Sequence, residues 1–195
     1  MIIGIVLSSV PKISETFLIS KIKLLKDSGN EIILFTNQKK IFNLCRVVHQ
    51  RRTSKNTFIQ IGLMIVYILL LIIKRPRITK KFLALEKNDG VSLKKRIENL
   101  YLNSHILNEN MDWVHFGFAT LMLRRENIAG AVGAKMGVSF RGFDISIYPL
   151  KNRFCYQKCW NKIDKVHSIS LDLLNAAYEL GLKKNYSSFY YLSCD

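Results

Sequence analysis

A cation, a glycine and a carboxylate follow one another within four positions, at Arg141, Gly142 and Asp144. Arginine can hold a phosphate or carboxylate with two parallel hydrogen bonds, glycine lets a ligand approach the backbone, and a carboxylate accepts hydrogen bonds from sugar hydroxyls. The mostly apolar run Val138–Phe140 before them predicts a buried strand that ends in a polar loop. Open parallel sheets hold ligands at such strand ends, so this loop is a candidate binding site. An exposed Arg–Asp pair is the alternative on chemistry alone.

His115 stands at a second predicted strand end. The run Met111–Gly117 indicates a short buried strand that finishes at a histidine and a glycine. Histidine can transfer protons near neutral pH, and this position is again one where α/β sheets carry out chemistry. A lone histidine at a strand end is also common as a structural residue, so both interpretations stay open.

The first part of the chain predicts the elements that would position these residues. Ile2–Leu7 is a β-branched run typical of a strand covered on both faces. Ser14 can cap a following helix, which ends near Gly29, and Ile32–Phe35 predicts a second buried strand. This order, strand, loop, helix, strand, is the first unit of a parallel sheet with crossover helices.

The later segments continue the alternation. We expect connecting structure over 39–55, two helices within 79–110 that are broken at 88–90, a helix over 119–136, a helix over 152–161, a strand over 166–169, a helix over 171–180 capped by Ser170, and a last strand within 188–195. The predicted fold class is therefore α/β, a Rossmann-like parallel sheet with helices on both faces. The predicted domain covers residues 1–195, with a basic and apolar helical insertion around 39–110.

The net charge is the unusual feature of the composition. Thirty Lys and Arg against fourteen Asp and Glu give a formal charge of +16, which indicates anionic partners. Phosphates of nucleic acids, lipid headgroups and nucleotide or lipid-diphosphate ligands all qualify, and a merely solvated basic surface is the alternative. No helix-turn-helix, RNP or zinc-finger signature accompanies the charge, so no nucleic acid is expected as a partner.

Several other classes lose support from missing signatures. The sequence has neither a Gly-rich dinucleotide fingerprint nor a P-loop, which disfavours hydride transfer and nucleoside-triphosphate hydrolysis. The four cysteines are Cys45, Cys155, Cys159 and Cys194; their spacing disfavours a zinc site, and we expect neither a metal nor a cofactor. The amino terminus has no signal-peptide pattern, so we expect the cytoplasm.

The most hydrophobic segment is Phe58–Ile73, which is followed at once by Lys74 and Arg75. Sixteen helical residues span only about 24 Å, short of the roughly 30 Å of a bilayer core. The segment is therefore expected to be a core helix, a helix lying in the headgroup region of a membrane, or, least in keeping with its length, a span. In the second case Ile65, Leu69, Lys74 and Arg75 would face an anionic bilayer.

Three runs and the carboxyl-terminal part together resemble a known family. They are 7–17 (LSSVPKISETF), 114–117 (VHFG), 138–145 (VSFRGFDI) and the strand-Ser-helix-Leu-Gly pattern over 166–181. In this order they are similar to the amino-terminal, acceptor-binding domain of GT-B glycosyltransferases of family 4 (group 1), in particular the enzymes of exopolysaccharide, lipopolysaccharide and colanic-acid synthesis. The resemblance covers nearly the whole chain.

The resemblance implies roles for individual residues. His115 corresponds to the family's cleft histidine and is the candidate catalytic residue. Arg141, Gly142 and Asp144 match a loop in which the family often has His-Gly-x-Asp, with arginine here in place of the histidine. The loop after the first strand matches through Ser9, Ser14 and Glu15, which would face the donor diphosphate and the acceptor.

The family's activity requires a second domain with paired glutamates, which binds the nucleotide-sugar and does not follow within this sequence. The resemblance therefore implies the acceptor-binding half of a retaining enzyme that transfers a sugar from a nucleotide-sugar to a surface-polysaccharide or lipid-linked glycan. We expect a hexosyltransferase-like activity only when that second domain completes it, and a cytoplasmic, peripheral location on the inner face of the plasma membrane. A non-catalytic remnant or binding module that needs a separate partner is the alternative.

Overall fold

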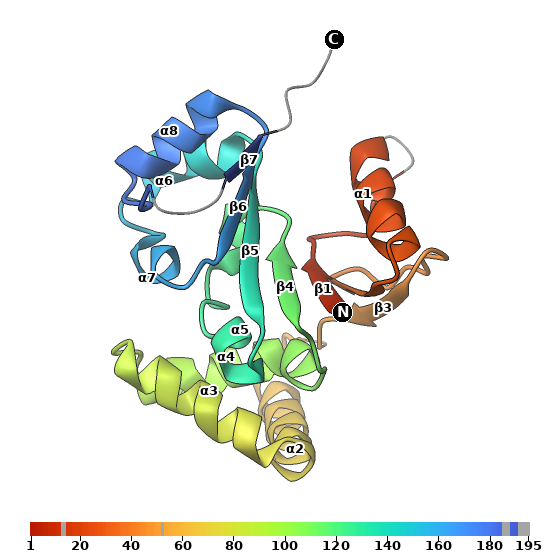
Figure 1. Ribbon diagram of the computed structural model, residues 1–195. Helices are drawn as coiled ribbons and strands as arrows, with labels where there is room; N and C mark the ends of the chain where they lie inside the picture. The colour runs from red at the N-terminus through yellow and green to blue at the C-terminus, as the bar shows by residue number, and fades with distance from the viewer. Residues whose placement is uncertain (13–14, 52, 185–187, 191–195) are drawn as a thin grey trace.

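The computed structural model describes residues 1–12, 15–51, 53–184 and 188–190, and its centre is a parallel β-sheet (Figure 1). The strands are β1 (Ile2–Val6), β2 (Glu31–Thr36), β3 (Arg46–His49), β4 (Trp113–Phe116), β5 (Lys135–Phe140), β6 (Lys165–Ser168) and β7 (Ser188–Tyr190). Their order in the sheet is β3-β2-β1-β4-β5-β6-β7, and every neighbouring pair is parallel. The strand order reverses beside β1, which confirms the predicted Rossmann-like α/β class.

Eight α-helices and two short turns connect the strands within the described residues. They are α1 (Thr16–Asp27), α2 (Thr57–Lys74), α3 (Pro76–Asn88), α4 (Leu93–Leu107), the 3₁₀ turn η1 (Ala119–Met122), α5 (Ile128–Val132), the π-helical turn η2 (Phe143–Ile147), α6 (Tyr148–Lys151), α7 (Gln157–Trp160) and α8 (Leu171–Glu179). Because parallel crossovers are right-handed, the step from β1 to β2 places α1 on one face. The next step, to β3, runs the same way and contains no helix, and the steps from β3 to β7 run the other way and place their helices on the opposite face. Helices thus cover both faces, and of the described helices only α1 lies on the first.

Each strand divides its side chains between these faces. On the face with many helices, Val114 and Phe116 of β4 and Val138 and Phe140 of β5 join the main core together with residues of α3 to α8. On the α1 face, the buried apolar side chains of the strands belong to β1 and β2, where Ile3, Ile5, Ile32 and Leu34 pack with Leu18 and Ile22 of α1. Val47 of β3 and Trp113 of β4 add to this cluster from its sides. Beyond Trp113, this face carries the polar side chains of His115, Ser139 and His167.

A buried polar network ties the helices of the larger layer together. The Glu86 carboxylate of α3 accepts hydrogen bonds from the amides of Asn99 (2.7 Å) and Asn127 (3.0 Å). Asp89 forms an ion pair with Lys162 and also accepts from Asn127. Since every donor and acceptor here has a partner, the network stabilises the arrangement of α3, α4 and α5.

Several predicted elements are confirmed. The chain breaks between α3 and α4 around Asp89, as predicted, and the Ser170 hydroxyl accepts from the Leu173 amide at the start of α8. The predicted strands at the amino terminus and around 111–117 and 166–169 correspond to β1, β4 and β6, and the predicted last strand is described only over β7.

Three expectations were wrong in detail. The connecting segment 39–55 contains β3, an edge strand that begins the predicted insertion and pairs with β2 through Val47 and Val48. The helix predicted over 119–136 is only η1 and α5, because the left-handed Gly133 (φ 81°) ends α5 and β5 begins at Lys135. The helix predicted over 152–161 is reduced to α7, where Phe154 has a positive φ of 60° that interrupts a helix.

The apolar segment forms α2, which lies outside the core. Asn56 caps its first turn through bonds from the amides of Phe58 and Ile59. Of its eighteen residues only Leu71 is buried, so burial in the protein core was the wrong alternative for this helix. By length and composition α2 is the one helix within the described ranges that could cross a membrane, with a mean hydropathy of 2.3.

Candidate functional site

A groove runs between α1 and the part of the sheet that α1 leaves uncovered. We call it the α1 groove; its lining residues are Phe17, Ser20, Lys21, Leu24 and Leu25 of α1, and His167 and Ile169 on the other side. The cavity measures about 450 Å³. Its lining is mainly apolar, with Ser20, Lys21 and His167 as the polar members, and such a combination is typical of ligand sites.

Three polar side chains, one from each of three adjacent strands, form a cluster at the sheet side of the groove that we call the floor; of the three, His167 is the one that lines the cavity. In the sheet register His115 of β4 lies opposite Gly137, and Ser139 of β5 lies opposite His167 of β6. The Ser139 hydroxyl is 2.9 Å from His115 Nε2 and 3.3 Å from His167 Nδ1. The two imidazoles thus share one hydroxyl between them.

Gly137 makes room for this arrangement. A Cβ at this position would come within 2.8 Å of Trp113 Nε1 and 2.9 Å of His115 Nδ1. The side chains of Trp113 and His115 therefore lie directly over the glycine, which explains why a residue without a side chain stands in the middle of β5.

Lys21 reaches the floor from α1. Its Nζ lies 3.0 Å from His115 Nε2. An ammonium group can only donate, so Nε2 accepts this bond and the proton of the neutral His115 ring sits on Nδ1. Burial, together with the nearby Arg141, lowers the pKa of Lys21 to about 8. The lysine is therefore charged at neutral pH but close to its titration.

The histidines are held in their neutral form. Burial lowers the pKa of His115 well below its ordinary value, and the cations of Lys21 and Arg141 and the neighbouring His167 add to the effect. Burial and the same two cations lower the pKa of His167 to about 4. At neutral pH both imidazoles can accept hydrogen bonds, while the positive charge of the site resides on Lys21 and Arg141.

Arg141 follows β5 and lies at the mouth of the site. Its guanidinium stacks between two aromatic rings, 4.2 Å from the centroid of Phe17 and 4.6 Å from that of Phe118. Burial lowers the pKa of Arg141, and the carboxylates of Glu15 and Asp144 oppose this shift. Its Nε is buried without a hydrogen-bond partner among the described residues, so the guanidinium keeps donor capacity for a ligand.

Asp144 and Gly142 shape the loop that presents Arg141. The Asp144 carboxylate is buried and accepts from the amides of Ala119 (2.8 Å) and Arg141 (3.0 Å). Gly142 has φ 120° and ψ −85°, a conformation that favours glycine, and its carbonyl accepts from Ile145 and Ser146 as η2 begins. Both residues thus position the loop in this structure, and Asp144 uses its two oxygens on the backbone.

The loop between β1 and α1 contains the remaining predicted residues. Ser9 is partly exposed on this loop, and Glu15 accepts from the Lys12 amide (2.8 Å) at the start of α1 while its charge acts on Arg141. Ser14 lies outside the described residues. Glu15, Arg141 and His115 are thereby brought to one edge of the sheet.

Sequence reasoning missed Lys21, Ser139 and His167. Lys21 falls within the helix predicted between Ser14 and Gly29, and Ser139 falls within the run Val138–Phe140, but neither residue was given a role. One signal was present: Val-His-Phe at 114–116 and Val-His-Ser at 166–168 place a histidine at the same point of two strands. The register of these strands with β5 is what brings the histidines together.

The described ranges contain no group of three or more His, Cys, Asp or Glu side chains that could hold a metal ion. Cys45, Cys155 and Cys159 are free thiols, and Cys194 lies outside the described residues. Burial raises the pKa of Cys45 to about 11 and that of Cys159 still further, so these two thiols stay protonated.

No family model and no curated protein matches the chain. Among solved structures, two of sucrose-phosphate synthase from Thermosynechococcus elongatus are similar. The first has a TM-score of 0.49 and 10% identity over 97% of this chain and 87% of that chain; the second has 0.47 and 8% over 97% and 47%. The chain thus spans about half the length of the second structure.

Proposed function

We propose that the chain is the acceptor-binding part of a GT-B glycosyltransferase of the family 4 type, which moves a sugar from a nucleotide-sugar to a surface-polysaccharide or lipid-linked glycan. The observation that carries the proposal is the α1 groove. Apolar side chains line it together with Lys21 and His167, at the carboxyl edge of a Rossmann-like sheet. His115 contacts Lys21, and Arg141 stacks on Phe17, so a second histidine and a second cation adjoin the groove. The sequence resemblance in the runs around His115 and Arg141 supports it independently.

The chemistry of the groove suits a substrate that joins a sugar to a diphosphate. Lys21 and Arg141 supply positive charge for phosphate oxygens, and the Phe17 ring that stacks on Arg141 keeps its guanidinium extended. His115 is neutral, so its Nε2 can accept a hydrogen bond from a sugar hydroxyl in place of Lys21. A charged imidazolium could not accept this hydrogen bond, so the lowered pKa of His115 would serve binding of the sugar.

Transfer requires a domain that holds the nucleotide-sugar and closes over the acceptor to exclude water. This chain would contribute the acceptor-binding site and His115, and the nucleotide-sugar donor would bind chiefly to that second domain. The proposed reaction uses no cofactor. A binding module that acts with a separate partner remains the second candidate, because the described residues contain one Rossmann-like unit.

The proposed place of action is the cytoplasmic face of the plasma membrane, where lipid-linked glycans are elongated. The exposed apolar side chains of α2 and the charge of +16 support a peripheral attachment to an anionic bilayer. Ile65 and Leu69 would enter the bilayer surface and Lys74 would face the headgroups. Arg75 is engaged instead within the protein, with Asn110 and the carbonyl of Asn108.

Binding of an acceptor analogue by the full chain tests the proposal. The probe is N-acetylglucosamine linked through a diphosphate to a short isoprenoid, and the measurement is isothermal titration calorimetry. Ile169→Glu places a carboxylate at the rim of the α1 groove and should weaken binding at least about tenfold through blocking and charge repulsion. Leu171→Glu is the matched control, because Leu171 is similarly exposed but lies at the start of α8 outside the groove lining. Equal affinities for both variants would reject the groove as the acceptor site.

Turnover tests the role of His115 separately. In the enzyme that includes the donor-binding domain, His115→Ala should lower kcat by about a hundredfold or more while the chain stays folded. Unchanged kcat would remove His115 from the reaction and favour the binding-module candidate.

A further inference from the structure

The exposed surface of α2 is apolar along a continuous ridge. Ile65, Val66, Leu69 and Ile73 are all at least half exposed, and at Gly62 nothing lies within 4 Å of where a Cβ would stand. On the opposite side, α2 packs on α4 through Leu71 and its neighbours. An exposed ridge of this kind on a strongly basic protein fits the surface of an anionic bilayer.

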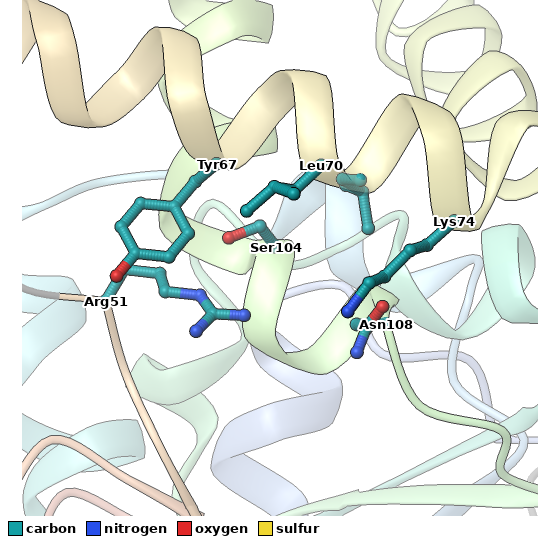
Figure 2. A pocket seen from close by; sticks show the side chains of 7 residues that line it. Arg51, Tyr67, Leu70, Lys74, Ser104 and Asn108 are labelled. Atoms are coloured by element: carbon teal, nitrogen blue, oxygen red, sulfur yellow. The ribbon is translucent and has the colours of Figure 1, made fainter.

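A small basic pocket opens beside this ridge, between α2, α4 and the segment after β3. We call it the basic pocket; it measures about 150 Å³ and is lined by Arg51, Tyr67, Leu70, Leu71, Lys74, Ser104 and Asn108. Figure 2 shows Arg51 on one side of the pocket and Lys74 on the other, with Ser104 in the middle and Asn108 beside the end of the Lys74 side chain. Two cations and two uncharged polar groups thus surround one space.

The residues of the basic pocket are held in place. The Arg51 guanidinium lies 4.5 Å from the centroid of the Tyr67 ring, which fixes its plane. Arg75 donates to the carbonyl of Asn108 (2.9 Å) and so anchors the end of α4 that carries this amide. Ser104 Oγ donates to the Tyr101 carbonyl (2.8 Å), which leaves its lone pairs available.

The positive charge of the basic pocket has no counter-charge. The ion pairs of the described residues join Arg46 to Glu109, Arg124 to Glu98 and Lys162 to Asp89, and none includes Arg51 or Lys74. Arg51 Nε is moreover buried without a hydrogen-bond partner in the part of the chain that the structure describes. A buried donor without a partner is unfavourable unless a ligand supplies the acceptor.

We propose that the basic pocket binds the phosphate of one anionic lipid headgroup when α2 lies in the membrane surface. Arg51 donates to two phosphate oxygens, Lys74 supplies the second charge, and the amide of Asn108 completes the site. The inference rests on the membrane location proposed above and adds a defined lipid site to it. It concerns a surface separate from the α1 groove.

The position of the basic pocket on α2 matches the depth of lipid headgroups when the apolar ridge is immersed in the bilayer. Tyr67, Leu70 and Lys74 follow one another at spacings of three and four residues and so occupy one side of α2. The ridge of Ile65, Leu69 and Ile73 occupies another side, so the basic pocket opens on the flank of the helix. When the apolar ridge of a helix is immersed in acyl chains, lipid headgroups surround the flanks of that helix. Long lysine and arginine side chains on the flanks can then reach the headgroup phosphates.

Vesicle flotation with the full chain tests the site. Two kinds of vesicle are built from digalactosyldiacylglycerol, a neutral lipid without phosphate, and carry the same negative charge, one from phosphatidylglycerol and the other from a diacylglycerol succinate, whose anion is a carboxylate. The wild-type chain should bind the phosphatidylglycerol vesicles about tenfold more tightly, because the site recognises the phosphate as well as its charge. The double variant Arg51→Gln/Lys74→Gln should bind both kinds equally.

Lys183→Gln/Lys184→Gln is the matched control. It removes the same charge beyond α8, far from α2 in Figure 1, and should keep the preference for phosphatidylglycerol. If the double variant at the basic pocket unfolds, Asn108→Asp replaces it, since a carboxylate there repels phosphate without removing either cation.

Each failure has a distinct meaning. A wild-type chain that binds both vesicles equally overturns the lipid site and leaves the membrane location intact. A chain that binds neither overturns both, while sugar-acceptor binding in the α1 groove stays unaffected. Tight binding of inorganic phosphate in solution, without any vesicle preference, overturns the assignment to a lipid.

Discussion

The two faces of the sheet differ although the same strands build both. On the face with many helices, Phe140 is fully buried in the main core. One position earlier, Ser139 points the other way and contacts His115 and His167. The face that is packed is apolar, and the face that α1 leaves open beyond β1 is polar, concave and charged.

This difference assigns the stability of the chain mainly to the packed face and ligand binding to the open face. The apolar face needs no ligand, because its side chains already contact one another. On the α1 face Lys21 and His167 line a groove that is open to a ligand, and His115 and the stacked Arg141 lie beside its lining residues. We therefore expect substitutions on the two faces to affect different measurements.

The largest expected effect is on the packed face. Phe140→Ala should lower the free energy of unfolding by about 3–5 kcal/mol, because it removes a fully buried ring and leaves a cavity. Ser139→Ala should cost about 1 kcal/mol, since it removes one hydroxyl group from the floor of the groove. Urea unfolding followed by circular dichroism compares the two. Similar losses for both variants would contradict the separation of the two faces.

Acid should destabilise the chain through its buried histidines. Burial, with the cations of Arg125 and Arg51 adding to it, lowers the pKa of His105 to about 3, so the folded state keeps it neutral. The stability from this group is complete above the unfolded pKa of 6.5 and is lost as the pH falls toward 3. At pH 5 the loss is about 2 kcal/mol.

The control for this prediction is His105→Gln, which cannot titrate. The variant is expected to be less stable at pH 7 but to lose less stability than the wild type between pH 7 and pH 5. Parallel curves for the two proteins would contradict a lowered pKa of His105 in the folded state.

On the open face, the charge of Lys21 should determine anion binding. Lys21→Gln should weaken binding of the diphosphate-linked acceptor probe about tenfold by removing a charge that faces the groove. Lys23→Gln is the control two positions along α1, where the side chain is exposed. Titration calorimetry at constant ionic strength measures both affinities, and a loss of the same size for Lys23→Gln would mean that only net charge matters.

The smallest expected effect is a pH dependence of the same binding. Because the pKa of Lys21 is lowered to about 8, raising the pH from 7 to 9 removes its positive charge. Affinity of the wild type for the probe should fall severalfold over this range. Lys21→Gln should show no such fall; a fall of equal size in the variant would assign the titration to another group.

The sequence predicted the fold class well because buried parallel strands have a strong local signal. The β-branched run that became β1 and the capped segment that became α8 were predicted from residue type alone. Short irregular elements were predicted poorly. A positive φ at Phe154 and an early start of β5 at Lys135 result from tertiary packing, which local propensity does not contain.

At the candidate site the sequence predicted single residues but not their arrangement. It singled out His115 and Arg141 because both stand at the ends of apolar runs, and the structure places both near Lys21, while their roles stay predictions. Asp144 was found for the same reason, but its carboxylate is used by backbone amides. Whether a carboxylate at a strand end points to a ligand or to its own loop depends on the fold of that loop, which residue types do not specify.

By itself the sequence determined the α/β class, the strongly positive net charge and the presence of a long apolar helix, since these follow from composition and periodicity. The tertiary structure decided that Ser139 lies between His115 and His167, that Lys21 reaches them, and that α2 is exposed. The physical reason is that register and crossover handedness act over long separations in the chain. They determine which alternate side chains meet on neighbouring strands and which face of the sheet remains open.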